Sequence, residues 1–180
     1  MTVSVPTIPS PKTEGVPAAH VAPSLEALFA SFLGTLPRLL SDERDLCGYS
    51  GQDPAVDAWI RAADASLAAT KAACGAVLAA PASGAAELNL QRVARLFIDV
   101  IRSADPDEVA CLRTHARLRR WAYSVPSEVT GARTINMMIA SALDRFESWL
   151  SLEDAFDARA EAWSDKGLDL PGTPDLGPAF

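Results

Sequence analysis

One histidine lies in the part of the chain that is expected to be helical, and it is the first candidate for chemistry. The sequence holds two histidines, and His20 falls in a proline-rich N-terminal stretch. His115 precedes Arg119 by four residues, a separation that puts two side chains one turn apart on a helix. On a helical wheel the pair lies between two apolar arcs, so we expect both side chains to point inward with the residues of those arcs. One arc consists of Cys111, Leu118 and Ala122, and the other of Val109, Leu112, Ala116 and Tyr123.

Two interpretations of this pair remain open. In the first, His115 and Arg119 line a groove that binds an anionic ligand or a partner's carboxylate, which suits the planar, permanently charged guanidinium. In the second, they are structural residues paired with a carboxylate on another helix, such as Asp144 or Glu147, because buried charges need partners. The other arginines of the segment fall on the far side of the wheel and are expected to meet water: Arg113, Arg117 and Arg120.

Common catalytic and metal-binding motifs are absent. The chain contains no GxxxxGK[ST], GxGxxG, HExxH or GxSxG. A di-iron bundle site needs Glu-x-x-His on two helices, but Pro17 and Leu112 stand three residues before the two histidines. The cysteines form no CxxC pair, and we interpret all three as reduced, small, buried apolar groups: Cys47, Cys74 and Cys111. We expect no metal and no cofactor, and we favour a non-enzymatic protein.

Composition argues against two further classes of partner. The chain has 180 residues, a net charge of −7 and a pI of about 4.8, so general attraction to nucleic acid is not expected. No apolar run approaches the roughly 20 residues of a membrane span, and the N-terminus lacks the pattern of a signal peptide. We therefore expect a cytoplasmic protein with neither a nucleic acid nor a membrane as partner.

Charge is distributed unevenly along the chain. Residues 92–133 carry eight basic and five acidic residues, a net +3, whereas residues 144–180 carry three basic and nine acidic residues, a net −6. We expect the basic segment to neutralise the acidic region within the same chain. Charged residues three and four apart also predict a solvated, locally paired face near the start of the basic segment: Arg92, Arg95, Asp99 and Arg102.

Helices must position these side chains. Apolar residues recur at spacings of three and four, and no segment alternates with a period of two. We expect an all-α bundle of four to six helices formed by residues 24–166, with a flexible proline-rich leader at 1–23 and a flexible proline- and glycine-rich tail at 167–180. The expected helices cover residues 25–40, 54–80, 85–104 and 106–123, and a last region that starts between residues 127 and 132.

Particular residues mark the ends of these helices. Ser24 is a suitable N-cap, and Asp105 followed by Pro106 provides a cap and a proline at the first helical position. Pro37 is expected to end or kink the first helix. Ser151 with Asp154 loosely resembles a capping box, so a new helix is expected to begin there.

The first helix allows two interpretations of its own. Residues 25–40 are strongly apolar, with Glu26 and Arg38 as the only charged residues. Such a helix could dock in a partner's groove or lie on a membrane surface, although one basic residue makes lipid a poor fit. The alternative, which we favour, is that it closes the protein's own core.

The second helix carries small residues on the side opposite its large apolar stripe. They repeat at alternating steps of four and three: Ala58, Ala62, Ala65, Ala69, Ala72 and Ala76. Small side chains permit close helix approach, so this alanine face could form a homodimer seam, or alanine is present only as a good helix former. The sequence therefore predicts an interaction or regulatory module, with a homodimer as one form. A small-molecule binding protein or enzyme with a pocket at His115 and Arg119 is the alternative.

Overall fold

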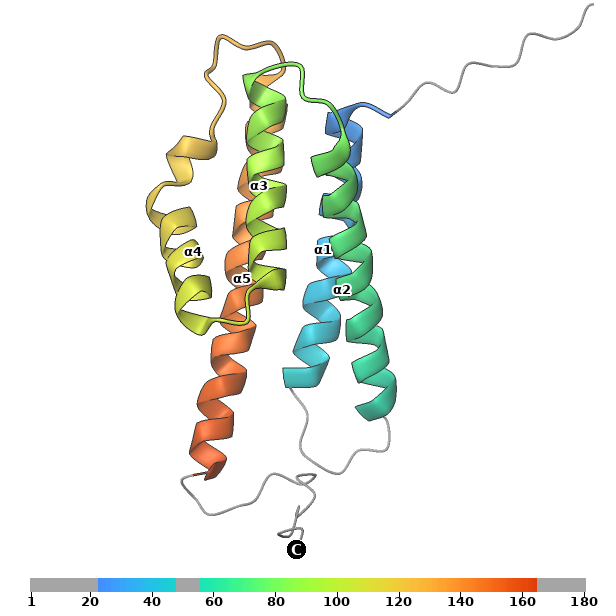
Figure 1. The fold of residues 1–180 in the computed structure, drawn as a ribbon, viewed down its shortest axis with the longest axis vertical. Helices are drawn as coiled ribbons and strands as arrows, with labels where there is room; N and C mark the ends of the chain where they lie inside the picture. Colours follow the sequence, from blue (N-terminus) through green and yellow to red (C-terminus); the bar gives the residue numbers. More distant parts are fainter. Residues whose placement is uncertain (1–22, 48–55, 165–180) are drawn as a thin grey trace, which may run out of the picture.

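The computed structural model describes residues 23–47 and 56–164, with side chains described as far as Leu152. These ranges contain five α-helices, one short 3-10 helix and no strand, which confirms the predicted all-α bundle (Figure 1). The predicted leader and tail lie outside the described residues, apart from Pro23. The elements in chain order are α1 (Leu25–Cys47), α2 (Val56–Ala79), α3 (Ala85–Arg102), α4 (Pro106–Leu118), η1 (Arg120–Tyr123) and α5 (Ala132–Ser164).

α1, α2, α3 and α5 form the bundle, and α4 lies outside it. α1 and α2 run antiparallel as a hairpin, while α3 and α5 pack against that hairpin and against each other (Figure 1). α4 and η1 form an outer layer that packs against α3 and α5 (Figure 1). No helix in the described part of the chain is both long and apolar enough to cross a membrane.

Aromatic rings join three of the helices in the core. Phe97 of α3 meets Phe32 of α1 and Phe146 of α5 edge to face, each at 5.0 Å between ring centroids. Trp149 of α5 stacks on Phe97 at 6.2 Å with an interplanar angle of 2°. Such pairs contribute stability beyond the burial of their area. Because Phe32 and its apolar neighbours on α1 are buried here, the interpretation of the first helix as part of the core is confirmed.

α1 continues through Pro37, where the sequence predicted an end or a kink. Proline has no N–H group, so the carbonyl of Leu33 loses its normal partner within the helix. Arg145 of α5 donates to that carbonyl instead, with its Nη1 atom 2.8 Å from the oxygen. The prediction that the helix stops near residue 40 is therefore wrong, because a side chain from a distant helix satisfies the carbonyl.

The fourth predicted helix divides into α4 and η1. It begins as expected, with Pro106 in the first turn and the Asp105 side chain accepting from the Asp107 N–H at 2.9 Å. It ends at Leu118 rather than near residue 123. After η1, the Asn136 side chain binds both the N–H and the carbonyl of Val125, at 2.7 and 2.9 Å. This anchor on α5 holds the chain in an extended course that a continuing helix could not follow.

α5 is a continuous helix of 33 residues, so the predicted new start at Ser151 is wrong. The Ser151 hydroxyl donates to the Glu147 carbonyl one turn earlier at 2.8 Å, and it accepts from Arg113 of α4 at 2.9 Å. It therefore caps no helix. The start of α5 lies in the expected range, and Gly131 before it has a φ of +79°, a left-handed conformation that favours glycine.

Candidate functional site

The two predicted site residues on α4 do not point into the core. His115 and Arg119 are both exposed, so the predicted inward direction is wrong. α4 covers the bundle with a single face, and that face carries Val109, Leu112 and Ala116. The apolar arc expected at Cys111 and Leu118 is likewise exposed, because nothing in the described residues packs on that side.

Only one of the two residues, His115, lines a groove in the structure. Arg119 is the C-cap of α4, with φ −112° and ψ 29°, and its backbone N–H donates to the carbonyl of His115 at 2.9 Å. Its side chain therefore does not continue the helical direction that a wheel assumes. His115 lines a groove on the outer side of α3, and Arg119 is not among the residues that line it.

The predicted carboxylates do pair with this segment, but with other arginines, one on α4 and one on η1. Arg113 Nη2 lies 2.8 Å from Glu147 Oε1, and Arg120 Nη2 lies 2.7 Å from Asp144 Oδ1. Both arginines were expected to face water. The two ion pairs bear out the expectation that the basic segment meets acidic residues of the same chain, whereas the partners foreseen for His115 were wrong.

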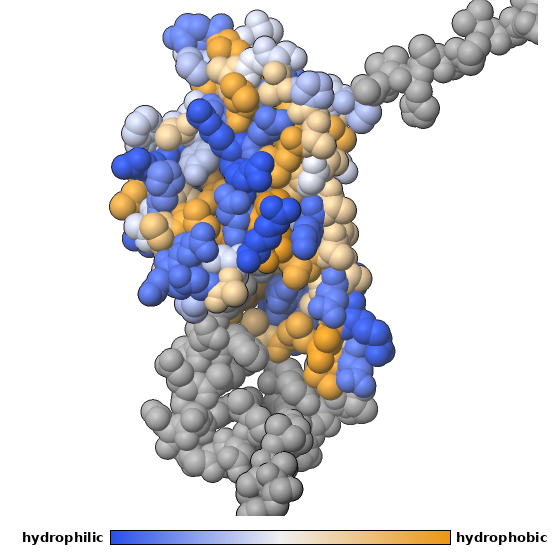
Figure 2. Space-filling model, viewed as in Figure 1, coloured by the Kyte–Doolittle hydropathy of each residue, from blue (hydrophilic) through white to orange (hydrophobic). Residues whose placement is uncertain are grey.

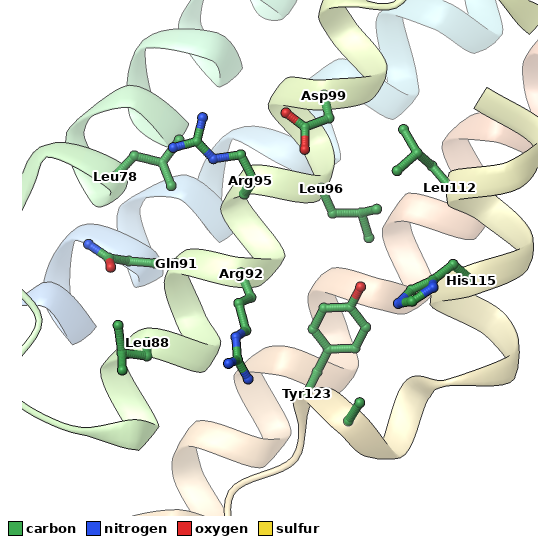
Figure 3. A pocket seen from close by; sticks show the side chains of 11 residues that line it. Leu78, Leu88, Gln91, Arg92, Arg95, Leu96, Asp99, Leu112, His115 and Tyr123 are labelled. Atoms are coloured by element: carbon green, nitrogen blue, oxygen red, sulfur yellow. The ribbon is translucent and has the colours of Figure 1, made fainter. Parts of the chain in front are cut away.

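The groove beside His115 has a volume of about 600 Å³ and opens between α3, α4 and η1 (Figure 3). On the face shown in Figure 2, hydrophilic and apolar residues lie side by side over α3 and α4, where the groove opens. Most of its lining is apolar or aromatic, with a few polar groups between: Leu78, Leu88, Gln91, Arg92, Arg95, Leu96, Asp99, Leu112, His115, Ala122 and Tyr123.

Hydrogen bonds hold one of the groove's arginines in place. Arg92 Nη1 donates to Asn89 Oδ1 at 3.0 Å, and Asn89 Nδ2 donates to the carbonyl of Ser124 at 3.1 Å. Burial raises the pKa of Tyr123, and the nearby charge of Arg92 opposes that rise. The phenol therefore stays neutral at pH 7 and can donate a hydrogen bond. Figure 3 shows the Tyr123 hydroxyl and the His115 imidazole facing the same part of the groove.

Positive charge exceeds negative charge in this groove. Arg92 and Arg95 contribute guanidinium groups, and Asp99 is the one carboxylate among the described lining residues. The local ion pairs predicted on this face do not form within the described part, and Figure 3 shows Arg95 extending toward Leu78 and away from Asp99. The arrangement can bind an anionic group above an apolar floor.

Sequence reasoning missed two members of this site. Arg92 and Arg95 were visible as a pair at a spacing of three, but they were interpreted as a solvated face. Only the packing of α4 and η1 against α3 turns that face into the wall of a groove. Tyr123 was identified as an inward residue, but its place in η1 was not.

The alanine face lies on the outer side of α2. Ala62 is half-buried and the other members are exposed, so this side remains open to solvent in the described structure: Ala58, Ala65, Ala69, Ala72 and Ala76. The large residues on the opposite side of the helix meet α1 and α3. Pairing with a second copy stays a prediction.

The cysteines occupy three different environments. Cys74 is buried, and desolvation raises the pKa of its thiol to about 12, which keeps it protonated. Cys47 is half-buried and its thiol donates to the Leu152 carbonyl at 3.5 Å. Cys111 is exposed, so the prediction that all three are buried is wrong. No three His, Cys, Asp or Glu side chains in the described ranges are grouped to hold a metal.

No protein-family model, curated protein or solved structure matches this chain. The chemistry of the groove therefore has to be inferred from its own side chains.

Proposed function

We propose that the protein is a non-enzymatic interaction module that binds an acidic segment of a partner protein in the groove between α3 and α4. The observation that carries this proposal is the charge of the groove. Arg92 and Arg95 line it beside His115, and Asp99 is the single carboxylate among its described lining residues. In the described residues, neither the Arg95 nor the His115 side chain has an ion-pair partner.

The shape and the apolar floor favour a peptide over a small anion. Leu96 and Leu112 form part of the floor, and the exposed Leu88 lies toward one end. An amphipathic acidic segment can bury apolar side chains on such a floor while its carboxylates meet the arginines at the rim. A small anion needs only the guanidinium groups.

A small anionic molecule, or a substrate, is the second candidate for the same groove. The observation in its favour is that the His115 imidazole and the Tyr123 hydroxyl face the same part of the groove (Figure 3). These groups could orient a carboxylate, with the neutral phenol as donor. Arg119, which the sequence predicts beside His115, has no role in either candidate function because it does not line the groove.

A titration of the full chain can separate these candidates. The probe is an amphipathic peptide of leucine and glutamate, followed by NMR, with the same peptide carrying glutamine and with citrate as comparisons. We expect the acidic peptide to shift resonances of residues in the groove and to bind more weakly as salt increases. Arg95→Gln should weaken binding about 5- to 10-fold, because a charge-assisted contact is lost.

Arg119→Gln is the matched control, because it removes an exposed arginine just outside the groove. It should leave the affinity unchanged. Equal binding of the glutamine peptide, or an equal loss in the Arg119 variant, contradicts the proposal. Citrate binding with no peptide binding selects the second candidate.

Self-association is part of the same proposal and has its own test. A dimer through the alanine face should give twice the monomer mass in light scattering, and Ala69→Glu should return it to a monomer because it introduces a charge into the seam. A parent protein that is monomeric at micromolar concentration removes the dimer. A cytoplasmic location also remains a prediction.

A further inference from the structure

A second pocket lies at the end of the bundle where α3 stops (Figure 1). The turn after α3, the C-terminal end of α1 and the N-terminal end of α2 all contribute to its lining. α2 has 24 residues and α3 has 18, so α3 is about 9 Å shorter than its neighbour. The pocket at this end has a volume of about 1010 Å³.

Apolar side chains from four helices make up most of the described lining. α1 supplies Leu46, α2 supplies Val56, α4 supplies Val109, and α5 supplies Leu150 and Leu152. An apolar pocket of this size with a few polar groups has the usual character of a site for a small molecule.

The pocket is long because it follows α4. Its lining on this helix begins at Pro106 and ends at Arg117, which is about 16 Å further along the helix axis. An extended alkyl chain of about ten carbon atoms covers most of that length. The shape of the pocket therefore favours an elongated ligand.

The charged residues of the lining differ in whether the chain supplies their partners. Asp105 caps α4, and Arg113 is paired with Glu147. Arg117 is exposed, and its side chain forms no ion pair or hydrogen bond with the described residues. Its guanidinium group is therefore available to a negatively charged ligand in the pocket.

Glu43, on α1, does not neutralise this arginine. Burial, followed by the charges of Asp42 and Asp64, raises the pKa of Glu43, and no charge of Arg117 opposes that rise. A guanidinium group beside the carboxyl would lower its pKa, so the two side chains belong to different parts of the pocket. A negative charge on a ligand is therefore favoured beside α4 and disfavoured beside α1.

We propose that this pocket binds a single-chain amphiphile with an anionic head group, such as a medium-chain carboxylate. The alkyl chain lies along α4 on the apolar lining, and the carboxylate meets the Arg117 guanidinium and the Thr114 hydroxyl. These two lining residues are three apart, so they share one side of the helix. Both are exposed, so a head group at the rim can reach them.

This site is separate from the groove beside His115. The two hollows share no residue among their described lining residues. The proposal therefore does not depend on the proposed function of that groove.

Three ligands with the same alkyl chain test the charge of the head group on the full protein chain. They are decanoate, decan-1-ol and decyltrimethylammonium, each kept below the concentration at which it forms micelles, with binding followed by NMR. Decanoate should bind about 3- to 10-fold tighter than the alcohol, because it gains a charge-assisted contact. Decyltrimethylammonium should bind more weakly than the alcohol. Butanoate, which lacks most of the alkyl chain, should bind more than about tenfold weaker than decanoate.

Two variants, each with a matched control, locate the site. Arg117→Gln should remove the preference for decanoate over decan-1-ol and leave the affinity for the alcohol unchanged. Arg133→Gln makes the same change of charge at an exposed position outside the lining and should keep that preference. Ala110→Phe narrows the pocket from an exposed position on α4 and should weaken both ligands. Ala68→Phe, exposed on α2 and outside the lining, should weaken neither.

Three results would overturn the proposal. The first is that the parent protein does not bind decanoate, or binds it no more tightly than decan-1-ol, which does not depend on any variant folding. The second is that Arg117→Gln keeps the full preference for decanoate. The third is that Ala110→Phe leaves both affinities unchanged, because the alkyl chain would then bind elsewhere on the protein.

Discussion

The interior of the bundle and the α4 layer are built on different principles. Phe97 on α3 is fully enclosed and touches aromatic rings of α1 and α5. α4 buries one face, and partly exposed ion pairs from Arg113 of α4 and Arg120 of η1 tie this layer to α5. Stability should therefore reside mainly in the interior. Substitutions on α4 should cost little stability. Because this helix also lines the groove beside His115, it is the part of the molecule available for binding.

The sharpest test of this comparison is truncation at its centre. Phe97→Ala removes a fully buried ring with three aromatic neighbours and should lower the free energy of unfolding by about 3–5 kcal/mol. Leu118→Ala, on α4 and 69% exposed, should change it by less than about 0.5 kcal/mol. Urea unfolding measures both. Similar losses at the two positions would break the comparison.

The contact between α5 and the proline of α1 should give the next largest effect. Arg145→Met leaves the Leu33 carbonyl without its donor, and we expect a loss of about 1–3 kcal/mol. Pro37→Ala restores a backbone N–H for the same carbonyl, so Arg145→Met should cost less in that background. A double-mutant cycle by urea unfolding measures the difference. An equal cost with and without the proline would show that the carbonyl is not the reason.

The N-cap of α4 should have a smaller, local effect. Asp105→Ala removes the acceptor for the Asp107 N–H and should cost about 1 kcal/mol. Because α4 is an outer layer, amide hydrogen exchange should accelerate in α4 more than in α3. Uniform acceleration across the bundle would mean that α4 unfolds only together with the interior.

The ion pairs that join α4 and η1 to α5 should contribute least. In the outer pair, Arg120 and Asp144 have side chains that are 47% and 67% exposed, so Arg120→Gln should cost less than about 1 kcal/mol. Arg113 is 23% exposed and also donates to Ser151, so Arg113→Gln should cost more. Thermal unfolding at low and high salt compares them. A larger loss for Arg120 would reverse this order.

The pH dependence of Glu43, near the C-terminal end of α1, sharpens the same comparison. Its pKa in the folded state is raised above the ordinary value of 4.5, chiefly by burial, so the ionised form is disfavoured by folding. Glu43→Gln should therefore raise the melting temperature at pH 7, and the advantage should vanish below pH 4.5, where the glutamate is protonated in both states. A constant difference across this range would contradict the assignment.

The helices of the interior could be predicted from spacing alone. Apolar residues such as Phe32, Leu36 and Phe146 fall where a period of 3.6 puts them, and each is buried. The effect of Pro37 could not be predicted, because the residue that compensates it lies on a helix far away in the sequence. Rules based on neighbouring residues describe the hydrogen bond that Pro37 removes, but not the distant Arg145 side chain that replaces it.

The groove was less accessible to sequence reasoning. A wheel drawn through residue 123 assumes that α4 is continuous, but Asn136 fixes Val125 and the helix ends at Leu118. Arg119 is therefore the C-cap of α4 and is not among the residues that line the groove with His115. The groove also needs the opposing wall of α3, whose Arg95 looks like any exposed charge until α4 packs beside it. Sites made from two helices depend on packing that one helical pattern does not contain.

The bond between Arg145 and the Leu33 carbonyl has a consequence for how this sequence can evolve. An arginine at position 145 has this task only while position 37 is proline, and with proline there the Leu33 oxygen has a donor only while the arginine remains. Substitutions at the two positions should therefore arise together among descendants of this chain. Covariation between them would mark the contact of α1 with α5 without any coordinates.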